Sequence, residues 1–490
     1  MASTPDVLLI SDDELLLSAA RLAIKARWEI EVRPNLDPSF LLPGSKVGTI
    51  ILDDQNLPAN ERDRALAQMR ARAPHASLIY VATLHSDEYE RWARAMGVNY
   101  YLAKPIESSR FASVLTSFLE HRATAQNHGR RTGTEREIKS MKAFAMTELD
   151  HVGLVDKTIP KPGPNDAVVR TTKALICTSD SHTVHGAIGP RHNLTLGHEA
   201  VGIVHEVGSE VKLFKPGDRV VVGAITPDWG DPASQAGHSS QSNGALGGWK
   251  FANLKDGVFA EYFHVNGADA NMARIPDDVS EESAVYCCDM MSTGFMAAEN
   301  ADIPIGGTVA VFALGPVGLM AIAGAKLRGA GTIIGVDSIP ARHELARFYG
   351  ADLVVDHTKT DAVAEILKLT HNEGVDAAIE ALGGNEAFQN AIKVTKPGGV
   401  ISNAGYHGKG EFVAIPRIEW GVGMAEKTIR TGLCPGGRLR MERMLRLLQT
   451  KRIDPTRMTT HRFNFSEIEK AFQMMDKKQD GIIKPLISFS

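Results

Sequence analysis

Cysteine is scarce in this sequence: four residues occur among 490, and they form no regular framework. Small secreted proteins that are held together by disulfide bonds use cysteine far more densely. The first seven residues also lack the basic stretch and apolar core that mark a secretory signal. We therefore expect a protein of a reducing compartment, the cytoplasm.

Neither sign of charge dominates, because 54 Lys and Arg residues stand against 58 Asp and Glu residues and the net charge is −4. A chain without a basic excess gives no general reason to expect nucleic acid or an anionic membrane as a partner. One apolar run, 308–325, is long enough to suggest a membrane span. Its strand-like first part and its Gly-Pro-Val-Gly break instead favour a buried strand, a turn and a helix. We expect no nucleic-acid partner and no membrane span.

The first 122 residues alternate short apolar runs with amphipathic stretches. Strands that alternate with helical patterns predict a parallel sheet, and ligands bind at the carboxyl edge of such a sheet. Polar residues follow the apolar runs closely, so we expect them at that edge. They are Asp12, Asp13, Asp54, Thr83 and Lys104.

In the order and spacing of these positions, residues 1–122 resemble the receiver domain of response regulators, which has a flavodoxin-like fold. The resemblance implies that Asp54 is the phosphoacceptor and that Asp12 and Asp13 hold Mg²⁺. Thr83 and Lys104 would contact the phosphoryl oxygens, and a histidine kinase or another phosphodonor would be a partner. The glycine-free segment 59–63 departs from receivers. A receiver fold that takes no phosphate and serves in docking or dimerisation therefore stays open.

A polar linker is expected at 123–140, which is nearly free of large apolar side chains. At Met141 a new strand pattern begins, as if a second protein started there. Residues 141–292 are rich in strands and glycine turns, 293–432 alternate strands with helices, and 433–490 return to a mixed pattern. This order predicts a catalytic domain that is interrupted by an inserted nucleotide-binding domain.

Metal ligands gather between positions 177 and 199. Cys177 is followed closely by Ser179 and His182, and a Gly-His-Glu sequence contains His198 and Glu199. A thiolate, an imidazole and a carboxylate are ligands that Zn²⁺ prefers. The sequence therefore predicts a zinc site.

A glycine-rich turn, Ala313-Leu-Gly315-Pro316-Val317-Gly318, follows an apolar strand and opens a helix of small residues. A dinucleotide-binding fingerprint requires that context, although alanine replaces its first glycine here. Gly315 would let a pyrophosphate approach the helix N-terminus, and Gly318 would let the helix pack on the strand. Zinc together with a nicotinamide predicts hydride transfer on an alcohol or a carbonyl.

Residues 141–490 resemble the zinc-dependent medium-chain alcohol dehydrogenases, through Gly197-His198-Glu199-x-x-Gly202 about twenty residues after Cys177. The stretches 226–229, 248–251, 289–294 and 432–438 narrow the resemblance to the tetrameric bacterial secondary-alcohol dehydrogenases. It implies a GroES-like, strand-rich catalytic domain with an inserted doubly wound Rossmann domain. The whole chain would be an α/β multidomain protein and a homotetramer.

By this resemblance, Cys177, His198 and Asp289 ligate one catalytic zinc ion per chain, and Glu199 is an exchangeable fourth ligand. Such a set leaves a Lewis acid with an open position for substrate. Cys287 and Cys288 directly precede Asp289 and remain alternatives for the third ligand, since many members of the wider superfamily use cysteine there. The segment 223–256 contains no cysteine, so no structural zinc is expected.

For the reaction, Ser179 is expected to pass the alcohol proton to a base or to water, with His182 as the next station. The resemblance also implies a substrate pocket of Ser179, Trp249, Tyr406 and Cys434, with Met424 reaching a neighbouring subunit. Aromatic and sulfur side chains around zinc make a small apolar cavity that suits short secondary alcohols and methyl ketones. Judged without the resemblance, Trp249 and Tyr406 are better explained as core aromatics.

The cofactor is expected to be NAD rather than NADP. The strand 332–336 ends in Asp337-Ser338-Ile339, and an acid there accepts hydrogen bonds from the adenosine ribose and repels a 2′-phosphate. The NADP-using members of the family carry Gly-Ser-Arg at these positions.

The expected function is therefore zinc-dependent oxidation of small secondary alcohols to ketones, and the reverse, with hydride transfer to NAD. The N-terminal domain would modulate the enzyme or assemble it. The alternative is a signalling protein that binds NAD(H) as a redox sensor and turns over little.

Overall fold

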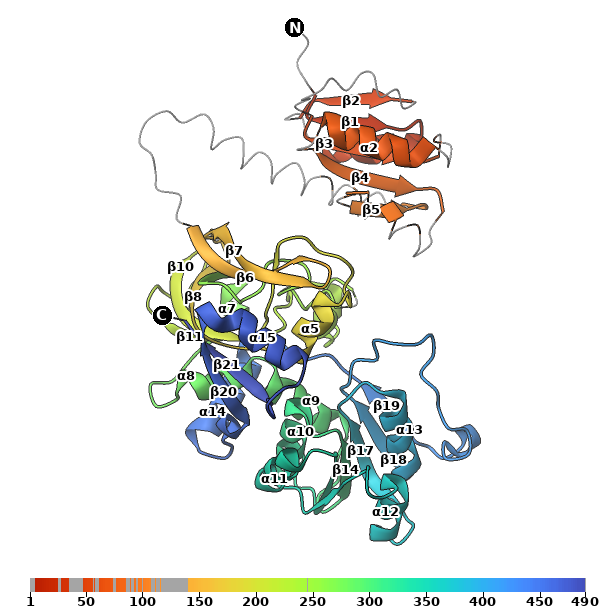
Figure 1. Cartoon of the computed structure of the whole chain (residues 1–490), viewed down its shortest axis with the longest axis vertical. Coiled ribbons are helices and arrows are strands. Elements are labelled where there is room, and N and C mark those ends of the chain that lie inside the picture. Colours follow the sequence, from red (N-terminus) through yellow and green to blue (C-terminus); the bar gives the residue numbers. More distant parts are fainter. Residues whose placement is uncertain are drawn as a thin grey trace. The chain divides into compact units, whose positions relative to one another are not determined.

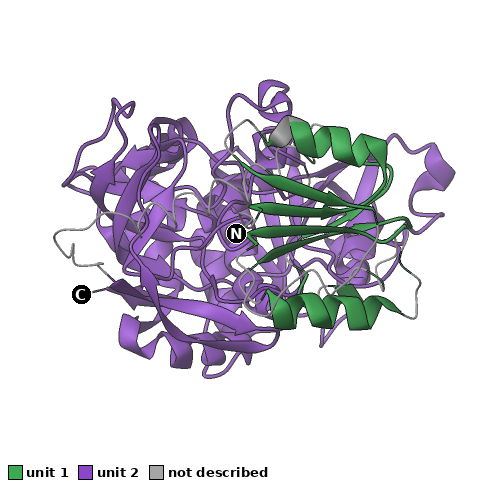
Figure 2. Cartoon of the chain, turned by 90° about the horizontal axis from the view of Figure 1, so that it is seen from above, with its two compact units in different colours: residues 1–137 green, residues 138–490 purple. Residues whose placement is uncertain are grey.

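The computed structural model divides the chain into two units, residues 1–137 and 138–490, which Figure 2 colours separately. It describes residues 5–24, 28–34, 47–55, 57, 61–73, 76–84, 89, 92–93, 96–98, 100–106, 111, 115, 140–244 and 246–489. The predicted linker 123–140 lies outside the described residues except for Ser140.

The first unit contains a parallel sheet of five strands in the order β2-β1-β3-β4-β5. The strands are β1 (Val7–Ile10), β2 (Ile30–Arg33), β3 (Thr49–Asp53), β4 (Ser77–Ala82) and β5 (Tyr100–Ala103), and the helices include α1 (Glu14–Ala23) and α2 (Arg62–Arg72). Separate apolar clusters cover the two faces of this sheet. The order 2-1-3-4-5 is that of flavodoxin-like proteins, which bind ligands where the strand order reverses, between β1 and β3.

The second unit has a mainly antiparallel sheet of seven strands and a smaller sheet in the order β7-β6-β9 (Figure 1). The large sheet runs β13-β11-β10-β8-β21-β20, and β12 also pairs with β8. Because β21 from the C-terminus pairs with β8, the first and last parts of this unit share one sheet. The strands are β6 (Ser140–Glu148), β7 (His151–Thr158), β8 (Ala167–Leu175), β9 (Leu194–Thr195), β10 (Ala200–Val207), β11 (Arg219–Val222), β12 (Tyr262–Val265), β13 (Met272–Arg274), β20 (Thr459–Asn464) and β21 (Lys484–Ser488).

Between these parts lies a parallel sheet of six strands in the order β16-β15-β14-β17-β18-β19. In chain order this is 3-2-1-4-5-6, the strand order of the Rossmann fold. Its strands are β14 (Thr308–Phe312), β15 (Thr332–Val336), β16 (Leu353–Val355), β17 (Val375–Glu380), β18 (Thr395–Asn403) and β19 (Thr428–Thr431). The helices that follow them are α10 (Pro316–Leu327), α11 (Pro340–Tyr349), α12 (Ala362–Leu369) and α13 (Asn385–Val394).

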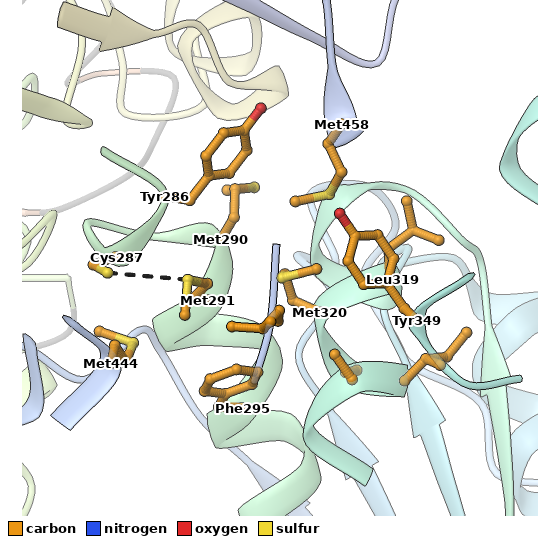
Figure 3. Close-up of a cluster of buried hydrophobic side chains, with 14 of the residues drawn as sticks. Tyr286, Cys287, Met290, Met291, Phe295, Leu319, Met320, Tyr349, Met444 and Met458 are labelled. Atoms are coloured by element: carbon orange, nitrogen blue, oxygen red, sulfur yellow. Dashed lines mark hydrogen bonds between the residues drawn. The ribbon is translucent and has the colours of Figure 1, made fainter. Parts of the chain in front are cut away.

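One continuous apolar core joins the two large sheets of the second unit. Figure 3 shows its centre, where side chains of α9 (Met290–Asn300) lie against those of α10. A Cβ at Gly294 would lie 2.4 Å from the Cβ of Met320, so the glycine is required for the close approach of these helices.

The remaining helices are short or lie at the rim. They are α5 (Thr178–Val184), α6 (Pro232–Gln235), α7 (Ala268–Asn271), α8 (Glu281–Ala284), α14 (Arg438–Gln449), α15 (Ile468–Asp476) and the 3₁₀ turns η3 (Ser239–Gln241), η4 (Val285–Cys287), η5 (Gly421–Gly423), η6 (Pro455–Met458) and η7 (Phe465–Glu467). Among the described residues, no helix has the length and apolar character needed to cross a membrane. The run 308–325 forms strand β14, a turn and most of α10, as its glycine break predicts.

Candidate metal and nucleotide site

A cavity of about 360 Å³ in the second unit brings together the two predicted motifs. Cys177, His198 and Asp289 line it on the side of the catalytic sheet, and the turn around Gly315 lines it on the side of the six-stranded sheet. The strands of both sheets therefore carry the metal motif and the nucleotide motif to one place.

Four side chains in this cavity could hold a metal ion. One ligand atom from each of Cys177, His198, Glu199 and Asp289 lies within 4.8 Å of the others. Glu199 is fully buried, and its Oε2 has no hydrogen-bond partner. A buried carboxylate oxygen without a partner is costly unless a cation or donor compensates it. The donor set of sulfur, nitrogen and oxygen therefore fits Zn²⁺.

Asp180, which the sequence analysis did not single out, ties two of these ligands together. Its Oδ2 accepts a hydrogen bond from the backbone N–H of Cys177 at 2.8 Å, and its Oδ1 lies 3.1 Å from Nδ1 of His198. The carboxylate keeps the proton of His198 on Nδ1 and leaves Nε2 free to bind a metal. Asp180 is completely buried, so this orientation is well determined by its surroundings.

Lys484 is the second residue that the sequence analysis missed. It is also completely buried, and its ammonium group donates to Oε1 of Glu199 and, at 3.1 Å, to the carbonyl oxygen of Ile176. Burial raises the pKa of Glu199, and the charge of Lys484 opposes that rise. Lys484 thus holds one oxygen of the carboxylate while the other remains available.

The side chains of Asp289 and of its two cysteine neighbours make different contacts. The Asp289 carboxylate accepts from Thr293 Oγ1, and its Oδ2 lies 3.4 Å from Nε2 of His198. Cys288 Sγ instead lies 3.3 Å from the carbonyl oxygen of Ala200, and Cys287 Sγ is 3.9 Å from Sδ of Met291, as Figure 3 shows for the latter pair. Burial raises the pKa of both thiols. The geometry favours Asp289.

The predicted proton path begins beside the metal ligands. Ser179 Oγ lies 3.3 Å from Nε2 of His198, and His182 lies one helical turn further along α5. His182 and Tyr406 both line the cavity, with their ring centres 5.8 Å apart. Burial lowers the pKa of His182, and the charges of Lys478 and His185 lower it further.

Of the predicted substrate-pocket residues, Trp249 and Cys434 line the same cavity. The Trp249 ring meets the His198 ring edge to face at 5.5 Å between centres. Met424 is absent from the described cavity wall and its side chain is 83% exposed. Exposure of this kind is compatible with a contact to another subunit.

The glycine-rich turn has the geometry that its motif requires. A Cβ at Gly318 would lie 1.9 Å from the carbonyl oxygen of Ala313, so only glycine fits there, whereas space beside Gly315 is open. Pro316 and Val317, the other predicted residues of the turn, also line the cavity. Ala313 has φ 70°, a left-handed conformation that explains why glycine is usual at this position.

Asp337 and its neighbour Ser338 follow β15, as predicted, and Asp337 is nearly buried. Its Oδ2 accepts from the backbone N–H of Leu314 at 2.8 Å, and its Oδ1 accepts from the N–H of Ile339 at 2.9 Å. A guanidinium group, Nη1 of Arg342, lies 3.2 Å from Oδ2. The sequence motif gave no indication of Arg342, because the motif ends before it.

In the first unit, the predicted residues divide into two groups. Both oxygens of Asp54 are engaged: Oδ1 accepts from N and Oγ1 of Thr83 at 2.6 and 2.7 Å, and Oδ2 accepts from the hydroxyl groups of Tyr80 and Tyr89. Lys104 instead forms ion pairs with Asp13 and Asp53.

Lys104 Nζ lies 2.7 Å from Asp13 Oδ2 and 2.9 Å from Asp53 Oδ2. Asp53 was not predicted, and Ser11 also donates to it at 2.7 Å. Asp12 is exposed. The lysine therefore faces Asp13 and Asp53 rather than Asp54, which differs from the arrangement that the receiver resemblance implies.

Comparisons with known proteins bear on the second unit. Residues 163–277 match the family described as alcohol dehydrogenase GroES-like domain, and residues 316–450 match the zinc-binding dehydrogenase family. The chain is 56% identical over 349 residues to the NADP-dependent isopropanol dehydrogenase of Thermoanaerobacter brockii, covering 71% of this chain and 99% of that protein. It is 52% identical to the enzyme of the same name from Clostridium beijerinckii, with the same coverage.

Solved structures agree with this relationship. The alcohol dehydrogenase from Thermus sp. ATN1 superposes with a TM-score of 0.65 at 30% identity, covering 71% of this chain and 100% of that one. The zinc-dependent alcohol dehydrogenase 2 from Streptococcus pneumonia superposes with the same TM-score at 32% identity, over 71% of this chain and 99% of that one. The chain thus belongs to the zinc-dependent medium-chain alcohol dehydrogenases.

Proposed function

We propose that the protein oxidises small secondary alcohols to ketones, and catalyses the reverse reaction, with NAD(H) as the hydride carrier. The observation that carries this proposal is the meeting of the Cys177, His198, Glu199 and Asp289 cluster with the glycine-rich turn in one cavity. Relatives named isopropanol dehydrogenases support the substrate class. The apolar wall around Trp249 and Cys434 supports a short, mainly apolar substrate.

When bound, Zn²⁺ would supply a Lewis acid that acidifies the alcohol, and the nicotinamide would supply the hydride acceptor. Alcohol and NAD⁺ then become ketone, NADH and one proton, which the chain must remove. Ser179 accepts the alcohol proton as it releases its own hydroxyl proton, and the His182 ring, which lines the same cavity, takes the released proton toward solvent. Ser179 and His182 share no direct hydrogen bond among the described residues, so a solvent molecule completes the path.

NAD is the proposed cofactor because Asp337 follows the second strand of the Rossmann sheet. The relatives cited above are named NADP-dependent, which favours the other cofactor. The acid at 337 and the isoleucine at 339 are the features of this chain that favour NAD.

For the first unit we propose a receiver-like module that modulates or assembles the enzyme. The flavodoxin-like strand order and the gathering of Asp13, Asp54, Thr83 and Lys104 at one sheet edge support this proposal. The engagement of both Asp54 oxygens favours the version that takes no phosphate. Treatment of the full chain with acetyl phosphate and Mg²⁺ tests this. A phosphoryl adduct at Asp54, detected by mass, would support phosphoacceptance. Mg²⁺ and a phosphodonor would then be partners of the first unit.

We also propose a homotetramer in which each chain has a receiver-like domain (1–122), a linker (123–140) and a dehydrogenase part with the segments 141–292, 293–432 and 433–490. Large apolar side chains are exposed beyond β18, among them Phe412 (74%), Ile418 (65%) and Met424 (83%). Such a patch is typical of a protein interface. Light scattering of the full chain measures the assembly size, and a monomer would contradict the proposal.

The test of the function uses zinc-loaded full-length protein with 2-propanol and NAD⁺. We expect NADH formation that is lost on chelation and restored by zinc, and that is abolished by Cys177→Ser. Absence of turnover in folded, zinc-replete protein with either cofactor would favour the alternative, a redox sensor that binds NAD(H).

A further inference from the structure

Asp337 is not a free negative charge. A carboxylate offers about four acceptor positions. Three donors already occupy this one: the N–H groups of Leu314 and Ile339, and the guanidinium group of Arg342. The Asp337 side chain is only 6% exposed. The charge that was expected to repel a 2′-phosphate is therefore offset by a cation within the same structure.

Arg342 itself faces the cavity. It lies in the first turn of α11, lines the cavity wall, and its side chain is 20% exposed. Within the described part of the chain, its guanidinium group donates only to Asp337. A guanidinium group has five N–H donors, so several remain for an anion. Burial lowers the pKa of Lys478, a second cation on this wall, and Arg342 lowers it further.

We propose that Arg342 is a specificity-determining residue that binds the 2′-phosphate of NADP(H), so that the chain accepts both dinucleotides. This proposal rests on the proposed binding of a nicotinamide dinucleotide at the glycine-rich turn. An acid after the second Rossmann strand binds the ribose 2′-hydroxyl, and an arginine nearby accommodates a 2′-phosphate. Arg342 is 3.2 Å from that acid, which puts it beside the 2′ position.

Arg342 can keep Nη1 on Asp337 and bind a phosphate with its remaining N–H groups, so the carboxylate is not left without its cation. Asp337 retains its two backbone donors, Leu314 and Ile339. The phosphate gains a guanidinium group, whose planar donors match phosphate geometry. Phosphate binding therefore breaks no contact of Asp337, and a modest preference between the two cofactors follows rather than exclusion of NADP.

The test is binding without turnover. Dissociation constants for NADH and NADPH are measured by dihydronicotinamide fluorescence, and those for AMP and adenosine 2′,5′-bisphosphate by calorimetry. The variant is Arg342→Gln, and the matched control is Arg347→Gln, an exposed arginine on the same helix. We expect Arg342→Gln to weaken NADPH and the bisphosphate about tenfold, a typical loss for one hydrogen bond to a charged group. NADH and AMP should change less than about twofold on the same scale.

Several results would overturn the proposal. Equal weakening of NADH and NADPH would make Arg342 a support for Asp337 alone, and unchanged NADPH binding would give it no role. Wild-type protein that binds NADH but not NADPH would also contradict it. Wild-type protein that binds neither would instead remove the proposed function, so the two failures are distinguishable. A wild-type preference for NADPH that Arg342→Gln abolishes would uphold the residue's role and correct only the NAD assignment.

Discussion

The buried pair of Lys484 and Glu199 allows a sharp test of how the metal site is held. Both side chains are 0% exposed, so solvent does not screen their interaction. Removing one partner of such a pair typically costs about 3–5 kcal/mol, because the other charge stays buried without compensation. Lys484→Met keeps the apolar stem and removes the ammonium group. We therefore expect it to lower the free energy of unfolding by about 3–5 kcal/mol.

A double-mutant cycle identifies the cause. The double variant Glu199→Gln/Lys484→Met leaves no unpaired charge, so it should be more stable than Lys484→Met alone. The control is Lys477→Met at an exposed position, where we expect a change within about 0.5 kcal/mol. Urea unfolding followed by tryptophan fluorescence measures the wild type, Glu199→Gln, Lys484→Met, the double variant and the control. A loss for Lys484→Met no larger than that of the control, or additive single effects, would refute this reasoning.

Zinc adds a second arm to the same experiment. A bound cation would compensate the Glu199 carboxylate that Lys484→Met leaves unpaired. The loss should therefore be larger in protein stripped by a chelator than in zinc-loaded protein. An equal loss of stability in the stripped and the zinc-loaded protein would mean that the Glu199 carboxylate does not interact with the metal.

Three further predictions follow from individual contacts. Asp180→Ala removes the acceptor that orients His198 and should lower zinc affinity about 10–100-fold in a competition assay with a metal indicator, whereas unchanged affinity would contradict the role of Asp180. Gly318→Ala places a Cβ 1.9 Å from a carbonyl oxygen and should abolish measurable NADH binding, which calorimetry tests; binding within twofold of wild type, as a rough limit, would show that the turn is not the nucleotide site. The hydrogen bond to Asp150 raises the pKa of His185; burial opposes this rise, and a second hydrogen bond to Asp476 adds to it. The protonated His185 side chain should therefore stabilise the fold below the pKa of the unfolded state. This stabilisation should be lost as pH rises through the pKa of the folded state. The difference in unfolding midpoint between wild type and His185→Gln should accordingly shrink from pH 6 to pH 9, a range set by the ordinary histidine pKa of about 6.5. The difference should be small, because the His185 side chain is half exposed. A difference that grows with pH would contradict the expected direction.

The repeating patterns of the sequence predicted the alternation of strands and helices in both parallel sheets and, in the second, two individual strands. Apolar runs such as 308–312 and 332–336 became β14 and β15 because strands buried on both faces are continuously apolar. Strand β2 was missed, since Ile30-Glu-Val-Arg33 is only four residues long, partly exposed and at the sheet edge. Edge strands bury little, so their sequences carry a weak signal.

The three site residues that were missed differ in how far along the chain they act. Lys484 pairs with Glu199 although the two residues are 285 positions apart in the sequence, and no local motif predicts such a pair. Asp180 could have been predicted, because an acid three residues after Cys177, at the start of a helix, can accept a hydrogen bond from the backbone N–H of Cys177. Arg342 follows a recognised motif by one helical turn, so only the structure connects it with Asp337.

The receiver resemblance illustrates a different limit. Order and spacing predicted that Asp54, Thr83 and Lys104 lie at one edge of a flavodoxin-like sheet, but they did not determine which acid the lysine would face. The adjacent Asp53 pairs with Lys104, while Tyr80 and Tyr89 fill the other side of Asp54. These two tyrosine donors, one in β4 and one after it, are not part of the receiver motif, so the sequence did not indicate them.

The most direct test of the central claim is isotope transfer from 2-propanol that carries deuterium at C2. Zinc-loaded full-length protein is incubated with this alcohol and NAD⁺, and the reduced cofactor is analysed by mass spectrometry. We predict that the deuterium moves to the nicotinamide ring while acetone forms in equal amount, as direct hydride transfer requires. Folded, zinc-replete protein that yields unlabelled cofactor, or none, with NAD⁺ and with NADP⁺ would contradict the account.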